Sequence, residues 1–457
     1  MYRLLTLGLL LAACNSSPSQ EIIPNDAIVI SSVNVINVRD GSTDPDKTVI
    51  ISDGKISEIL DEIPELPNGV SQIDGEGKYL MPGLTEMHAH IPSPEWGRNR
   101  TEETLFLYLS NGVTTIRGML GHPVHLELRE QAKHNEILSP RIFTSSPSLN
   151  GNTVPTPEEA REKVTAYQQD GYDFLKIHPG IPLDAFDELV KTANEVGINF
   201  AGHVPVDVGI RHALESGYAS VDHVDGFLEG LVPESAHVQP DQNGFFGYNF
   251  TDLADESKID ELVQMTNEYN VWVVPTQSLF DRWFSPEDAN ALARTNEMQY
   301  MPASTIENWV SSKQNLVNND GYSADQWETF NIIRQKLIYQ LHHNGHGLLL
   351  GSDAPQVFNV PGFSIHHELR GMLDAGLTPL EAIQIGTLNP AKYFGIEGEF
   401  GEVIPGASAD LILLNANPLD NIEALQGKTG VMVRGRWLSQ EEIDRRLSEI
   451  AKVSAQL

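Results

Sequence analysis

The stretch Tyr79-Leu-Met-Pro-Gly-Leu-Thr-Glu-Met-His-Ala-His-Ile91 decides how the rest of the chain is interpreted. It is a short apolar run that ends in two histidines two residues apart. In a β-strand, side chains at positions i and i+2 point the same way, so we expect His88 and His90 side by side at the carboxyl end of a strand. Such a pair suits a metal ion, although a lone His-x-His also occurs in ordinary protein cores. Its meaning therefore depends on the later strands.

Length and charge restrict the class of protein. A chain of 457 residues can form two or three average domains, or one large α/β barrel with attachments. Its 30 basic and 63 acidic residues give a formal charge of -33. This charge argues against nucleic acid or an anionic membrane surface as a partner and suits an enzyme that acts on a small-molecule substrate. A homo-oligomer is compatible with these numbers.

The first residues read as an export signal. Arg3 is followed by an apolar run to Ala13, which is too short for a membrane-spanning helix of about 20 residues. Leu11-Ala-Ala-Cys14 resembles the bacterial lipobox, so we predict a lipoprotein signal peptide over 1–13, lipidation of Cys14 and a tether over 14–26. A buried Cys14 behind an ordinary signal is the alternative. The prediction places the protein in the bacterial cell envelope on a lipid anchor, and Asn15 weakly favours the outer membrane or periplasm.

The two ends of the chain have the same character. Short alternating apolar runs separated by turns occupy residues 27–78, and runs of the same kind occur at 406–414 and 430–437. We therefore predict a small β-sandwich domain built from 27–78 and 397–457, the second part including a terminal helix. The barrel-like middle, 79–396, is inserted between them.

The middle of the chain alternates strands and helices. Capping signals mark several helix starts, such as Thr156 with Glu159 and Thr378 with Glu381. The expected strands are the one that ends at His90 and then 113–118, 141–145, 173–178, 198–203, 219–223, 271–276 and 347–353. Eight such units predict an α/β fold, a (β/α)8 TIM barrel, with the active site at the carboxyl ends of the strands. Two long connections, 225–270 and 277–345, are expected to roof that site.

Ionisable side chains occur at the carboxyl ends of five of these strands. Each has an ordinary explanation, such as a packed histidine, a turn-capping aspartate or a lysine that extends to the surface. Six at the catalytic end of one barrel indicate a metal site. The candidate ligands are His88, His90, Lys176, His203, His223 and Asp353.

This ordered set, with Met-Pro-Gly-Leu-Thr-Glu-Met-His-Ala-His before it and Pro-Gly-Ala-Ser-Ala-Asp-Leu-Ile-Leu-Leu after it, resembles the metal-dependent amidohydrolase superfamily. The likeness runs from about residue 27 to the C-terminus and is greatest to the imidazolonepropionase-like and Xaa-Pro-dipeptidase-like branch. It implies two divalent metal ions bridged by a carbamate on Lys176. His88 and His90 would hold the more buried ion, and His203 and His223 the more exposed one. Nitrogen and oxygen ligands favour zinc, with Mn, Co, Ni and Fe left open.

The resemblance also implies a reaction. A hydroxide that bridges the metals attacks a carbonyl, and Asp353 is the catalytic residue that moves the proton to the leaving nitrogen. We therefore predict cleavage of a C–N bond in a small amide, such as a dipeptide or N-acyl amino acid. The alternatives are a mononuclear hydrolase or deaminase of a cyclic amide or amidine, and a non-catalytic metal- or solute-binding lipoprotein. Because 203–207 reads His-Val-Pro-Val-Asp and lacks a tyrosine common in Xaa-Pro dipeptidases, that specificity is not carried over.

Substrate-binding residues are harder to predict. His178 shares the strand parity of Lys176 and should point inward near the pocket mouth, where it can contact substrate or make a structural hydrogen bond. His122, just past the second strand, is a weaker candidate of the same kind. Arg282 is a candidate partner for a substrate carboxylate. The first roof segment holds an aromatic cluster that lines a pocket or, as is more common, packs the roof itself: Phe245, Phe246, Tyr248 and Phe250.

Overall fold

The computed structural model describes residues 23–93, 95, 97–239 and 242–456. The predicted signal peptide, Cys14 and most of the predicted tether lie outside these residues. Within the described part of the chain, none of the helices combines the length and the apolar character needed to cross a bilayer.

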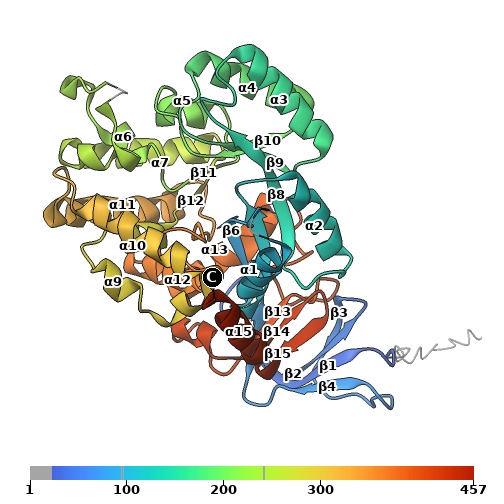
Figure 1. The fold of residues 1–457 in the computed structure, drawn as a ribbon. Helices are drawn as coiled ribbons and strands as arrows, with labels where there is room; N and C mark the ends of the chain where they lie inside the picture. The colour runs from blue at the N-terminus through green and yellow to red at the C-terminus, as the bar shows by residue number, and fades with distance from the viewer. Residues whose placement is uncertain (1–22, 94, 96, 240–241, 457) are drawn as a thin grey trace, which may run out of the picture.

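The centre of the molecule is a parallel barrel, which confirms the predicted fold class (Figure 1). Seven strands follow one another in sequence order around it, each paired in parallel with the next. They are β6 (Leu84–Ala89), β7 (Val113–Gly118), β8 (Arg141–Leu149), β9 (Phe174–Ile177), β10 (Asn199–Gly202), β11 (Ser220–Asp222) and β12 (Trp272–Val274).

The predicted eighth strand is irregular but still closes the barrel. In the described chain, residues 347–354 form isolated bridges to β12 and β6 rather than a continuous strand. Leu349 donates its amide to Val273 at 2.9 Å, and Met87 donates its amide to Leu350 at 2.7 Å. The segment therefore pairs with both of its neighbours. It loses strand geometry at Asp353, whose φ is 63°.

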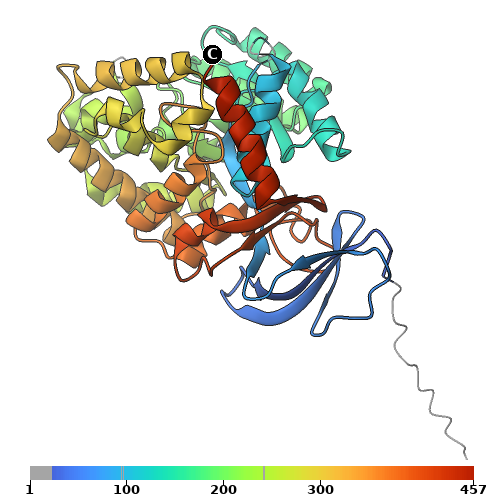
Figure 2. The ribbon, with the colours of Figure 1, turned by 60° about the horizontal axis from the view of Figure 1, so that its bottom comes forward.

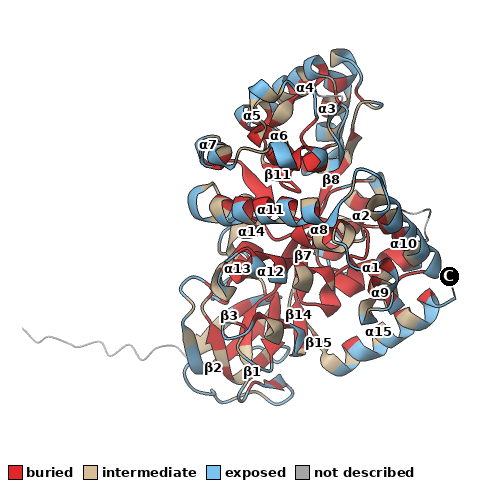
Figure 3. Cartoon of the chain, turned by 90° about the vertical axis from the view of Figure 1, so that its left-hand side faces the viewer, coloured by how far each residue is buried: buried red, intermediate tan, exposed pale blue. Residues whose placement is uncertain are grey.

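Helices surround the barrel with one face buried and one exposed, as α11 illustrates (Figure 3). The predicted start signals hold: Thr378 and Glu381 form a full capping box, and Thr156 accepts the amide of Glu159. The helices between or after barrel strands are α1 (Arg98–Ser110), α2 (Pro123–Lys133), α3 (Pro157–Asp170), α4 (Leu183–Val196), α5 (Gly209–Glu215), α7 (Ile259–Glu268), α11 (Ala324–Asn344), α12 (Ser364–Asp374), α13 (Pro379–Gly386) and α14 (Leu388–Tyr393).

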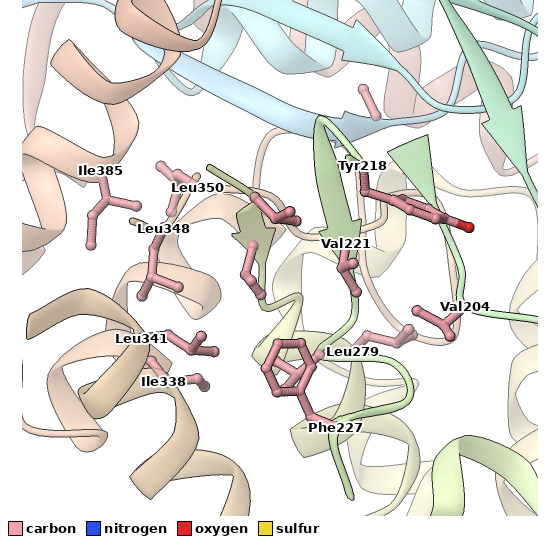
Figure 4. Packing of buried hydrophobic residues seen from close by; sticks show 14 of the residues in the cluster. Val204, Tyr218, Val221, Phe227, Leu279, Ile338, Leu341, Leu348, Leu350 and Ile385 are labelled. Carbon is pink, nitrogen blue, oxygen red and sulfur yellow. The ribbon is translucent and has the colours of Figure 1, made fainter. Parts of the chain in front are cut away.

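The core fills the space between strands and helices. Figure 4 shows Leu348 and Leu350 of the closing segment near Ile385 of α13, with Leu341 of α11 beside them, and all four side chains are buried. Burial of this kind stabilises by roughly 25 cal/mol per Å² of apolar surface. The closing segment is therefore anchored by packing where its hydrogen bonding is incomplete.

The two long connections that we expected to roof the site contain helices. After β11 come α6 (Phe227–Leu231) and the 3-10 helix η4 (Phe245–Leu253). After β12 come α8 (Gln277–Trp283), α9 (Ala289–Leu292), the 3-10 helix η6 (Asn296–Tyr300), α10 (Ala303–Val317) and α11.

Strands from both termini join into one separate sheet of eight strands, where the sequence predicted a sandwich (Figure 2). The reason is β5, which pairs in parallel with β1 and antiparallel with β13 and so links the two halves edge to edge. The first barrel strand begins after it. The sheet contains β1 (Ile28–Ile36), β2 (Thr43–Ser52), β3 (Lys55–Leu60), β4 (Ser71–Asp74), β5 (Tyr79–Pro82), β13 (Leu411–Leu414), β14 (Lys428–Val433) and β15 (Arg436–Ser439), and α15 (Gln440–Ser454) follows it.

Candidate metal centre

Three of the predicted ligands converge where β6 meets the closing segment. Asp353 donates its amide to the carbonyl of His88 at 3.0 Å, and this register places its carboxylate beside both histidines. Oδ1 of Asp353 lies 2.6 Å from Nε2 of His90 and 3.3 Å from Nε2 of His88. One ligand atom from each residue lies within 4.8 Å of the other two, which fits a divalent metal ion.

His203 and His223 lie next to this group. Neighbouring ring centroids are 5.4 Å apart for His90 and His88, 4.6 Å for His88 and His223, and 4.5 Å for His223 and His203. Nδ1 of His203 is 2.9 Å from Oδ2 of Asp225, and Nδ1 of His223 is 2.9 Å from Oγ1 of Thr276. Partners on Nδ1 leave Nε2 of each ring as the nitrogen for a metal.

Lys176 is fully buried on β9. Among the described residues, its Nζ atom has no hydrogen-bond partner. Burial lowers the pKa of the amine, although Asp222 and Asp353 act in the opposite direction. A buried amine without an acceptor is unfavourable in a site of metal ligands, unless the group is modified or bound to an ion.

Two residues that support the site escaped sequence reasoning. Oδ2 of Asp222 lies 3.0 Å from Nδ1 of His88, and Oδ1 accepts a hydrogen bond of 3.0 Å from Nη2 of Arg117. Arg117 also donates to the carbonyl of Met87 at 2.7 Å. The sequence did contain a sign of the role of Arg117, because it is a charged residue within an otherwise mostly apolar strand. Strand alternation hides Asp222, since adjacent residues should face opposite ways and His223 already faced the site.

Left-handed backbone at His223 explains that exception. His223 has φ 67°, and it is followed by Val224 with φ 56°. Non-glycine residues in this region each cost on the order of 1–3 kcal/mol and cluster at functional sites. Arg334 of α11 offsets part of this cost, because its Nη1 donates to the carbonyl of His223 at 2.7 Å and its Nη2 to Pro275 at 2.9 Å. The turn brings Asp222 and His223 to the same side of the barrel.

Of the two weaker candidates, His178 packs against His203, and His122 lines a cavity that also contains His90 in its wall. Nδ1 of His178 is 2.8 Å from Oγ of Ser148, and its ring stacks on His203 at 5.2 Å. Burial lowers the pKa of His178 to about 2. His122 caps α2, and its Nδ1 accepts the amide of Val124 at 3.2 Å. The structure thus gives each histidine a structural contact, and a contact with substrate stays a prediction.

A cavity of about 550 Å³ reaches the centre at His90. Apolar side chains such as Leu120, Met301 and Trp309 form part of its wall, and Arg100 and His122 supply polar groups. Arg100 lies on α1, and the second long connection contributes Met301 and Trp309 from its η6 to α10 region. This size lies within the range of ordinary small-molecule sites, about 300–1,000 Å³.

The first long connection supplies an aromatic side chain over the other end of the histidine row. The ring centroid of Phe246 is 6.0 Å from that of His203 and 5.6 Å from that of His223. Tyr248 and Phe250 are buried and pack the connection itself. The predicted aromatic cluster therefore divides between packing and the site.

Arg282 is not a free partner for a substrate carboxylate. Its Nη2 is 3.1 Å from Oε1 of Glu297, and that carboxylate is also 3.2 Å from Nε2 of His367. Burial acts to raise the pKa of Glu297, but the hydrogen bond with His367 and the charge of Arg282 outweigh it and lower the pKa to about 2. Sequence could not reveal this pairing, because the three residues lie on separate elements.

With this geometry in view, comparison identifies the class of protein. The family model of the amidohydrolase family matches residues 79–438, and the chain belongs to that family. Adenine deaminase 3 of Rhizobium meliloti (strain 1021) is 22% identical over 436 residues, which cover 91% of this chain and 58% of that protein. The chain spans little more than half the length of the first curated relatives it matches.

Solved structures share the fold. A bottromycin amidohydrolase has a TM-score of 0.72 at 22% identity, covering 94% of this chain and 91% of that one. A putative prolidase from Bifidobacterium longum has a TM-score of 0.67 at 23% identity, covering 93% of this chain and 99% of that one. At these identities the structural likeness supports the fold alone, namely the barrel with its attached sheet.

Replacing Asp222 by Asn tests the support of His88. The change removes the negative charge beside both Nδ1 of His88 and the buried guanidinium of Arg117. We expect about 10- to 100-fold weaker metal binding, the usual effect of losing such a partner. Metal titration against a chelator measures it, with circular dichroism to confirm folding and Asp260→Asn on the surface as control. Unchanged affinity in the folded variant would contradict this role.

Replacing Glu297 by Gln tests the ion pair with Arg282 through pH. Because the native carboxylate has a lowered pKa, its contribution is complete above the ordinary value of about 4.5 and is lost as the pH falls toward about 2. Between about pH 6 and pH 3.5 the wild type should therefore lose about 1 kcal/mol more unfolding free energy than the variant. Urea denaturation at both pH values measures this, with exposed Glu158→Gln as control. Equal losses in wild type and Glu297→Gln would refute the argument.

Proposed function

We propose that this protein is a metal-dependent hydrolase that cleaves the C–N bond of a small amide, such as a dipeptide or N-acyl amino acid. The observation that carries the proposal is the convergence of four histidines, a buried lysine and an aspartate at the carboxyl ends of barrel strands. Membership of the amidohydrolase family supports metal chemistry at these residues. The names of the solved relatives, an amidohydrolase and a prolidase, support an amide substrate.

The donor set fits two divalent metal ions, with zinc as the default for nitrogen and oxygen ligands. His88, His90 and Asp353 would hold one ion, and His203 and His223 the other. Lys176 would bridge them as a carbamate. When bound, such ions polarise a carbonyl and make water acidic enough to supply hydroxide near neutral pH.

Asp353 is the proposed proton carrier. Its side chain is 9% exposed, and its Oδ2 lies 4.0 Å from Nδ1 of His223 while Oδ1 contacts His90. Hydrolysis adds the hydroxyl of water to the carbonyl carbon and its proton to the leaving nitrogen. A carboxylate in contact with His90, which lines the cavity, can take that proton from water and return it to nitrogen as the C–N bond breaks.

A carbamate on Lys176 would explain why this side chain is buried among candidate metal ligands. Its neutral amine adds to CO2 with loss of one proton, which replaces a buried amine that has no partner among the described residues by two hard oxygen ligands. Such a group fits a position between two metal ions, where a protonated lysine would repel both.

Replacing Lys176 by Ala tests the carbamate. We expect loss of at least one bound metal and of most activity, with partial rescue by acetate or propionate, which supply the missing carboxylate. Metal analysis and turnover with and without these acids measure the effect. A variant that binds and turns over like wild type would exclude a bridging role.

The wall of the cavity and the net charge of the whole chain favour one class of substrate. Its apolar wall suits a hydrophobic side chain, and the formal charge of -33 disfavours polyanions. We therefore infer that the substrates are N-acyl or aminoacyl derivatives of hydrophobic amino acids, with at most one carboxylate. Neither nucleic acid nor a second protein enters this proposal.

A panel of amides tests the function. Zinc-loaded protein is incubated with hydrophobic dipeptides, N-acetyl amino acids, lactones and phosphotriesters, and the release of product is measured. We expect amides to react fastest and Asp353→Asn to be about 100-fold slower or worse, the usual scale of proton-transfer catalysis. If lactones or phosphotriesters outpaced every amide, the substrate class would be wrong while the metal centre remained. No turnover of any compound would favour a metal- or solute-binding lipoprotein.

A second candidate is hydrolytic deamination of a cyclic amide or amidine at a single metal. Its support is that several curated relatives are adenine deaminases. A mononuclear site needs no bridging ligand, so the buried Lys176 favours the first candidate. Release of ammonia from adenine by protein that contains one metal would reverse this preference.

We further propose that Cys14 is lipidated and anchors the protein in the bacterial cell envelope. The support is Leu11-Ala-Ala-Cys14 and the polar residues after it. Replacing Cys14 by Ser should move the protein from the membrane fraction to the soluble fraction after signal removal. Retention of the variant in the membrane would refute the anchor.

A further inference from the structure

A second cluster of ligand atoms lies away from the barrel centre, where the end of α11 meets the start of α13. One atom each from His342, His343 and Glu381 lies within 4.8 Å of the others. Nε2 of both histidines is 3.5 Å from the same carboxylate oxygen, Oε1 of Glu381. Because α11 ends before the closing segment begins, this cluster belongs to the amino-terminal end of the barrel. The catalytic residues belong to the opposite end.

We propose that His342, His343 and Glu381 form a binding site for one zinc ion or a similar divalent transition metal. Two imidazole nitrogens and one carboxylate oxygen are ligands that such ions accept. The side chains are 17%, 32% and 26% exposed, so an ion has access from solvent. Water would complete the coordination.

The distances favour metal ligation over a simple ion pair. Charge-assisted N–H···O hydrogen bonds are commonly about 2.7–2.9 Å long. Two donors that each lie about 2.0–2.1 Å from a tetrahedral metal are about 3.3–3.4 Å apart. The observed 3.5 Å to each histidine is close to that tetrahedral edge.

The surrounding bonds orient two of the three ligands, His343 and Glu381, in the way that metal sites require. Nδ1 of His343 lies 2.8 Å from the carbonyl of Tyr339, which places the ring proton on Nδ1 and leaves the Nε2 lone pair toward Glu381. Oε2 of Glu381 accepts from the amide and the hydroxyl of Thr378 at 2.7 Å, which leaves Oε1 as the ligand atom. Outer partners of this kind fix a ligand before the ion arrives.

An ion at this position would join two helices on either side of the closing segment. α11 leads into residues 347–354 through Gly345, and α13 packs Ile385 near Leu350 of that segment. An ion that binds only the folded protein stabilises it by mass action. We therefore expect zinc to raise the thermal unfolding temperature through this site, in addition to any effect of the barrel centre.

Zinc titration of the full-length protein, with its barrel centre already loaded, tests the site. The wild type should bind one more equivalent than His342→Gln, His343→Gln or Glu381→Gln, each of which should bind that equivalent at least tenfold more weakly. Glutamine at position 381 can keep the capping box with Thr378, so this variant separates lost ligation from lost folding. Cobalt provides the same count from its visible spectrum.

His134→Gln is the matched control. His134 is an exposed histidine at a helix end whose Nδ1 lies 2.8 Å from the carbonyl of Glu130, like His343, but among the described residues it belongs to no group of three ligand atoms. It should bind zinc as the wild type does, and turnover should be unchanged in all four variants. Equal zinc equivalents in wild type and Glu381→Gln would overturn the proposal and leave the contact as an ion pair.

Discussion

The catalytic end of the barrel depends on the hydrogen bonds that the buried guanidinium group of Arg117 donates. It donates to the carbonyl of Met87 next to His88, to Ser220 and Asp222 of β11, and to the hydroxyl of Tyr393 on α14. Asp222 in turn lies against His88. One buried cation therefore links β6, β7 and β11 and holds the carboxylate that lies beside His88, a candidate metal ligand.

A comparison of free energies explains why a barrel core can contain a buried arginine. Removing an ion from water costs several kcal/mol even after relaxation. Hydrogen bonds to charged groups return roughly 1.5–3 kcal/mol each, and Arg117 makes four. Four such bonds offset the cost of burial while every partner is present, and the loss of Asp222 would leave an uncompensated buried charge. Arg334 is a second arginine that supports the site, because it donates hydrogen bonds to the carbonyls of His223 and Pro275.

The sequence predicts those features of the structure that depend on neighbouring residues, and it fails for those that depend on contacts between distant residues. Strand periodicity and helix caps are local, so the barrel, seven of its strands and the positions of the candidate ligands at strand ends could be predicted. The single terminal sheet could not, because the pairing of β5 with β1 and β13 is set by contacts between distant parts of the chain. Sequence reasoning also failed to identify Asp222 and Arg100 as residues of the site. A left-handed turn breaks the alternation that would locate the first, and a cavity between separate helices defines the second.

The two sides of the centre differ in how firmly their ligands are fixed. His88, His203 and His223 each have an oxygen about 3 Å from Nδ1, supplied by Asp222, Asp225 and Thr276. Asp225 and Thr276, which follow β11 and β12, orient the rings of His203 and His223 before any metal binds, and the carboxylate of Asp222 at the end of β11 lies against His88. His90 and Asp353 instead contact each other, and His90 lines the cavity. Because a reaction requires one face of the centre to exchange water and substrate, the His90 and Asp353 side is where we infer that exchange takes place.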